Sequence, residues 1–114
     1  MATGSIKKEY KTGSVTASGS VDTSNLVVKQ DGNVVVINGF ASNVPLNNAQ
    51  IKIGDLYGVP FPKASVRSLA GCAANAYGHP ADVAYLVVGN GGDIQVNSTI
   101  VGTRVVYFSV SYIV

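Results

Sequence analysis

The last ten residues of the chain, 105–114 (VVYFSVSYIV), form its longest unbroken run of β-favouring residues. Side chains alternate between the two faces of a strand, so this run has one wholly apolar or aromatic face, as a strand against a core should. The other face combines apolar and aromatic side chains with Ser109 and Ser111, which favours contact with a partner subunit. We therefore expect this strand to organise the fold and to end the domain. Its core-facing residues would be Val106, Phe108, Val110, Tyr112 and Val114.

The composition indicates a single compact β domain. At 114 residues the chain is long enough to bury a core, and its 46% hydrophobic residues, 12% charged residues and 13 glycines do not fit a disordered chain. The net charge of +2 comes from Lys7, Lys8 and Lys11 against Glu9, and the remaining chain is neutral. We therefore expect no nucleic-acid partner and no membrane insertion, whereas a neutral and apolar body favours an oligomer.

Few residues could carry catalysis or hold a metal. Cys72 is the only cysteine, which excludes an internal disulfide and a thiol-rich metal site. His79 is the only histidine, and no G-x-S-x-G motif supports a triad built on it. The glycine-rich residues 89–92 lack the pattern of a phosphate-binding loop and are typical of a tight hairpin. We expect no enzymatic activity, no cofactor and no metal.

The chain in order predicts about eight short strands. The small residues of 64–76 could also form a helix of about three turns, but a strand is favoured because Gly71 lies in the middle of the segment and its surroundings are β. Asp31 and Gly32 lie between two β runs, which predicts a hairpin with a type I′ turn, and residues 89–93 predict a second hairpin. Residues 1–13 are expected to be a tag or flexible lead-in, and 14–114 a single domain. The spacing predicts a β-sandwich or a barrel. The expected strands are 14–21, 26–30, 34–40, 51–53, 64–76, 83–88, 94–97 and 105–114, with turns or loops at 41–50, 54–63 and 76–82.

The aromatic residues fall into two groups. Those on predicted strands, among them Phe40 and Tyr85, are expected to pack in the core or at an interface. A second group is on or near loops, where aromatic side chains on a rigid scaffold can stack on sugar rings or anchor a protein partner. The alternative is that these residues only cap the core. The candidate receptor-binding residues are Tyr57, Phe61, Arg67, Tyr77 and His79.

Four stretches in this order resemble the C-terminal head domains of tailed-bacteriophage fibres and related virion appendages. They are DGNVVVINGFA, the proline-rich VPFP, VAYLVVGNGGDIQV and the terminal VVYFSVSYIV, and together they cover roughly residues 14–114. The resemblance implies a jelly-roll-like antiparallel β-sandwich that forms a homotrimer on the virion. It further implies attachment outside the host cell to a surface receptor, in many such heads a glycan.

Three readings of function follow. The first is a trimeric fibre head that binds a host receptor. The second is a structural module that trimerises or decorates a capsid or tail without binding a receptor, and the third is a carbohydrate-binding module of a secreted cellular protein. For the first two, the trimer interface is expected on the second face of the last strand, at Val105, Tyr107 and Ile113.

Overall fold

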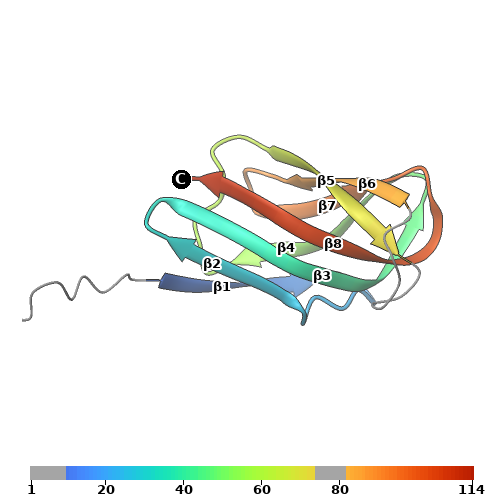
Figure 1. Cartoon of the computed structure of the whole chain (residues 1–114), viewed down its shortest axis with the longest axis horizontal. Coiled ribbons are helices and arrows are strands. Elements are labelled where there is room, and N and C mark those ends of the chain that lie inside the picture. The colour runs from blue at the N-terminus through green and yellow to red at the C-terminus, as the bar shows by residue number, and fades with distance from the viewer. Residues whose placement is uncertain (1–9, 74–81) are drawn as a thin grey trace, which may run out of the picture.

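A computed structural model of the chain describes residues 10–73 and 82–114. Within these ranges the fold is all-β and antiparallel, with eight strands and no helix, as the sequence predicts (Figure 1). No helix there could cross a membrane. The strands are β1 (Tyr10–Ala17), β2 (Leu26–Asp31), β3 (Val34–Asn47), β4 (Gln50–Tyr57), β5 (Val66–Ala73), β6 (Asp82–Val88), β7 (Asp93–Asn97) and β8 (Val101–Ile113).

The sheet closes into a barrel in the order β1-β2-β3-β8-β5-β6-β7-β4. This order consists of two three-stranded meanders, β1-β2-β3 and β5-β6-β7, joined through β8 and β4, and it differs from the jelly-roll-like sandwich that the resemblance implied. The closure depends on β1, which pairs with β2 through residues 10–13 and with β4 through residues 14–17. Gly13 lies where β1 changes partner, and a Cβ there would lie 2.6 Å from the carbonyl oxygen of Tyr57. A residue without a side chain therefore permits this close approach of strands.

The terminal strand takes part in the longest strand pairing among the described residues. β8 lies between β3 and β5, and its pairing with β3 runs from Val34–Ile113 to Asn47–Val101 (Figure 1). The expected core face is confirmed at four buried positions, while Val114 is partly buried against the core. The four are Val106, Phe108, Val110 and Tyr112.

Strand boundaries differ most from the expectation between residues 41 and 57. β3 continues through Pro45 to Asn47, because a bulge at Asn43, with φ of 55°, shifts the register while pairing with β8 resumes at Val44. Pro45 is tolerated because the pairs of β3 with β2 end at Gly39, so no β2 carbonyl needs a donor there. The next strand, β4, extends to Tyr57, well beyond the expected residues 51–53.

The two predicted hairpins are confirmed, with one change of turn geometry. Asp31 pairs with Val34, so the two central residues of the first turn are Gly32 and Asn33. Only Gly32 has positive φ, at 60°, which is the pattern of a type II′ turn and not of the expected type I′. The strand assignment of residues 64–76 is confirmed for 66–73, and residues 74–81 are not described. β1 begins at Tyr10, inside the expected lead-in of residues 1–13.

The segment after β4, residues 58–65, covers one end of the barrel. Val59 and Pro62 are buried, and the hydroxyl of Tyr112 on β8 donates a hydrogen bond of 2.6 Å to the carbonyl oxygen of Pro60. The ring of Phe61 lies against Gly92 in the β6–β7 hairpin, where a Cβ would meet it at 2.6 Å. The loop therefore closes one end of the core, which is one of the two roles that the sequence left open.

Candidate functional site

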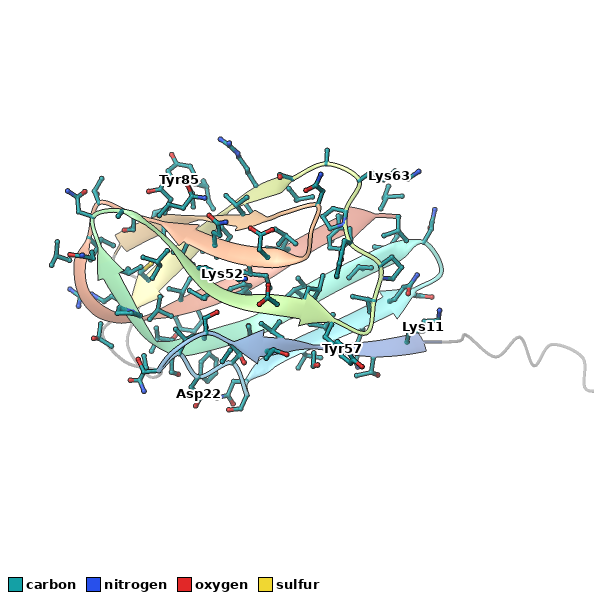
Figure 2. All side chains as sticks on the ribbon, turned by 180° about the vertical axis from the view of Figure 1, so that it is seen from behind. Lys11, Asp22, Lys52, Tyr57, Lys63 and Tyr85 are labelled. Carbon is teal, nitrogen blue, oxygen red and sulfur yellow. The ribbon has the colours of Figure 1, made fainter. Side chains whose placement is uncertain are left out.

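An open groove of about 540 Å³ lies on the outer face of the barrel where β4, β7, β6 and the start of β5 are adjacent. Its volume falls in the range of small-ligand sites. Figure 2 views this side of the molecule, with Tyr85 labelled at its edge and Lys52 on the neighbouring β4. The groove is lined by Gln50, Ser65, Arg67, Tyr85, Val87, Gly89, Asn90, Asp93, Gln95 and Asn97.

Tyr85 reaches the groove because β6 is apolar on both faces. Ala84, Leu86 and Val88 point inward and are fully buried, so the alternation of the strand directs Val83 and Tyr85 to the outside. Tyr85 keeps 57% of its surface exposed. An exposed phenol ring on a paired strand of a closed barrel is a rigid surface for stacking against an apolar ligand face.

Opposite Tyr85, three polar side chains form a hydrogen-bonded chain across β4 and β7. The Gln50 amide donates to the Gln95 side-chain oxygen, and the Gln95 amide donates to a carboxylate oxygen of Asp93 at 2.6 Å. The backbone of Asp93 also accepts a hydrogen bond of 2.8 Å from the amide of Gly89 in the turn. These contacts fix the orientation of two amides and a carboxylate, whose remaining donors and acceptors can meet the hydroxyl groups of a ligand.

The strand registers place these groups in rows across the groove. Arg67, Val87 and Gln95 lie in one row across β5, β6 and β7, and Tyr85 and Asn97 lie side by side in the next row. The ring of Tyr85 and the side chain of Val87 therefore form an apolar strip along β6. Arg67 lies on one side of this strip, and the amides of β7 lie on the other.

Beside the groove, a lysine and an aspartate on β4 form an ion pair with each other. Lys52 on β4 forms an ion pair of 2.8 Å with Asp55. The hydrogen bond to Asp55 raises the pKa of Lys52 above its ordinary value, and the charge of Asp93 adds to this effect. Both groups are exposed, so the pair stabilises the fold little but leaves the charge of Lys52 largely balanced.

The predicted receptor-binding residues do not form one cluster among the described residues. Arg67 lines the groove, whereas Tyr57 pairs with Ser14 on β1 and lies at the opposite edge of the molecule from Tyr85 (Figure 2). Phe61 packs on the β6–β7 hairpin. Tyr77 and His79 lie outside the described residues.

Sequence reasoning missed Tyr85 as a site residue and assigned it to the core or an interface. The available signal was the pattern VAYLVV, which is apolar in both phases of the alternation. In such a strand only one phase can face the core, so the other must present its residues outward. The amides of Gln50, Gln95 and Asn97 carried no signal, because their proximity depends on the pairing of β4 with β7.

A second surface lies on the outer face of β2, β3 and β8, which includes the expected trimer interface. Ile113 is 71% exposed, and the ring of Tyr107 packs against Phe40 of β3, with ring centroids 6.0 Å apart and an angle of 55° between the ring planes. Val105 differs from the expectation, because it is only 5% exposed and pairs with Ala73, which is also buried. Val105 is covered within a single chain and has little surface left for a partner.

No cluster of three or more histidine, cysteine or acidic residues suited to a metal ion occurs in residues 10–73 and 82–114. Cys72 is buried in the core. Comparison with protein-family models, with curated proteins and with solved structures found no match.

Proposed function

We propose that this barrel is a recognition domain that binds carbohydrate in the groove on β4–β7 and serves as the trimeric head of a virion appendage. The observation that carries the proposal is Tyr85, an exposed ring beside fixed amides and a carboxylate. A sugar ring has an apolar C–H face that stacks on an aromatic ring and hydroxyl groups at its edge that pair with amides and carboxylates. The groove presents both kinds of partner on adjacent strands.

The closed barrel supports recognition through side chains. The groove lies on the outer face of strands that are paired with one another, so a ligand there meets side chains and not the unpaired backbone of a sheet edge. Strands also hold side chains more rigidly than loops do, which lowers the entropy cost of binding. Attachment to a host receptor, outside the cell, follows from the resemblance of the sequence to fibre heads together with this groove.

The trimer is proposed to form through the outer face of β2, β3 and β8, with Tyr107 and Ile113 at the contact. This face bears exposed apolar side chains next to the small hydroxyls of Ser109 and Ser111, a composition suited to an interface that packs closely. It lies away from the groove in the strand order, so the groove stays accessible in a trimer.

The alternative is a structural module that trimerises without binding a receptor. The β2-β3-β8 face favours this alternative, because contact between subunits would bury that face without any ligand. Binding of any carbohydrate that depends on Tyr85 separates the two functions.

The proposal is tested by glycan-array binding of the labelled protein and of two variants. Tyr85→Ala removes the ring in the groove, and we expect it to weaken glycan binding about tenfold, near the upper end for one aromatic contact. Tyr57→Ala is the matched control, because Tyr57 is an exposed tyrosine, 71% accessible, on the far edge. Loss of binding in Tyr57→Ala alone would move the site to the loop predicted from sequence, and no binding by the wild-type protein would favour the structural module.

A further inference from the structure

We propose that the sugar in the groove is an acidic one, with a pyranose ring on Tyr85 and Val87 and its carboxylate on Arg67. This inference rests on the proposed function and specifies the ligand of the same site. The stacking surface and the amides do not distinguish a neutral sugar from an acidic one, whereas the charged groups of the groove do.

The charged groups of the groove differ in whether they already have a partner. The Asp93 carboxylate accepts a hydrogen bond of 2.6 Å from Gln95, and its charge also acts on Lys52 across the strands. Lys52 itself is paired with Asp55. Arg67, in contrast, has no hydrogen bond or ion pair with any described residue. The groove therefore offers one exposed cationic group that no described side chain engages and that is available to a ligand.

A guanidinium selects its partner by shape as well as charge. Its planar fork of N–H donors matches a carboxylate through two parallel hydrogen bonds, which makes such pairs stronger and more directional than those of lysine. Because a neutral hydroxyl would use only part of this capacity, a carboxylate is the group that fits Arg67 best.

The register sets the spacing between the guanidinium and the stacking ring. Arg67 pairs with Val87 and Leu69 pairs with Tyr85, so Arg67 and Tyr85 are diagonal neighbours on the same face of the β5–β6 ladder. Diagonal neighbours lie roughly 7–8 Å apart at the backbone, within reach of long side chains. A single sugar ring with one exocyclic carboxylate fits this span, with the ring over β6 and the carboxylate toward β5.

The opposite side of the groove fixes the orientation. Gln95 and Asn97 lie across the strip from Arg67 and can bind the ring hydroxyls, while the negative charge of Asp93 repels a carboxylate placed at that side. The acidic group is thus directed toward Arg67 by attraction at one side and by repulsion at the other. Hexuronic acids have this arrangement of a ring, hydroxyls and one exocyclic carboxylate.

The test compares glucuronate- and galacturonate-containing oligosaccharides with the same oligosaccharides after reduction of each carboxyl group to a hydroxymethyl group. Reduction removes the charge and keeps the ring and its stereochemistry. Titration calorimetry on the wild-type protein is expected to show about tenfold tighter binding of the acidic form, the effect of a charge-assisted hydrogen-bond pair.

Variants identify the residue responsible. Arg67→Gln should remove the preference for the acidic form, and Arg67→Lys should retain part of it, because lysine keeps the charge but not the fork. Lys63→Gln is the control, since it removes an exposed positive charge on the loop before β5, outside the groove lining. Circular dichroism checks that each variant keeps the barrel.

The outcomes separate this inference from the proposed function. Equal binding of acidic and reduced sugars by the wild-type protein overturns the acidic specificity and leaves carbohydrate recognition standing. An unchanged preference in Arg67→Gln overturns the assignment to Arg67. Absence of binding to both forms, and to a glycan array, overturns the proposed function together with the inference.

Discussion

Replacement of Tyr112 by Phe tests how the segment after β4 is held over the end of the barrel. The hydroxyl of Tyr112 donates a hydrogen bond of 2.6 Å to the carbonyl oxygen of Pro60, 52 residues away along the chain. The substitution keeps the buried ring and removes only this bond. Because Pro60 is exposed, water can reach its carbonyl in the variant, and we expect a loss of about 1 kcal/mol in the free energy of unfolding near neutral pH.

The same residue makes the free energy of unfolding depend on pH in the alkaline range. Burial raises the pKa of Tyr112 from 10.0 to about 12. The unfolded chain thus loses the phenolic proton before the folded one does, so this contribution to stability is complete below pH 10 and is lost as the pH rises toward 12. The full two-unit shift corresponds to about 2.7 kcal/mol. Solvent screening at the rim of the barrel reduces this, and we expect about 1 to 2 kcal/mol.

Urea unfolding followed by circular dichroism, at pH 8 and at pH 11.5, measures both effects. The two proteins differ only at this residue, so the difference in stability between wild type and Tyr112→Phe isolates this one hydroxyl. We expect the wild type to be the more stable protein at pH 8 and to lose that advantage at pH 11.5. An advantage that is absent at pH 8, or that is unchanged at pH 11.5, would refute the account of this contact.

Two further substitutions, each with a control variant, test the packing and the assembly. Gly39→Ala should destabilise the barrel by about 2–4 kcal/mol, because φ is 113° and the new Cβ would lie 2.1 Å from the Asn25 carbonyl oxygen. Gly19→Ala, at φ of 61° with nothing within 4 Å, should cost only about 1 kcal/mol in the same urea titration, and equal costs would contradict the steric argument. Ile113→Asp should change the stability of the single barrel by less than about 0.5 kcal/mol and, because Ile113 is placed in the proposed trimer interface, lower the solution mass from the proposed three chains to one by light scattering. A trimer that persists in Ile113→Asp would place the interface elsewhere. Val101→Asp is the control, because Val101 is similarly exposed and lies at the other end of β8.

Local patterns predicted the strands whose structure is set by neighbouring residues. The alternation in 105–114 identified the core face of β8, and the turn residues identified both hairpins, because side-chain period and turn chemistry are encoded within a few positions. The bulge at Asn43 was not predictable in this way. It lies within the long pairing of β3 with β8, whose residues are some sixty positions away in sequence, so no local pattern marks it.

The closure of the barrel and the groove depend on contacts between distant strands. β1 joins β2 to β4 by changing partner near Gly13, and the sequence of β1 alone is equally compatible with an edge strand of a sandwich. Likewise, the exposure of Tyr85 follows from which phase of β6 faces the core. Its neighbours in the groove come from β4, β5 and β7, which the order of strands brings together.

The most direct test of carbohydrate recognition is a titration of the ¹⁵N-labelled protein with uronic acid-containing oligosaccharides, followed by NMR chemical shifts of the backbone amides. The account predicts saturable shifts at Arg67, Tyr85, Val87, Gln95 and Asn97, with the β2-β3-β8 face unchanged. Shifts confined to residues near Tyr57, or no shifts at millimolar ligand, would contradict the assignment of this groove as the binding site.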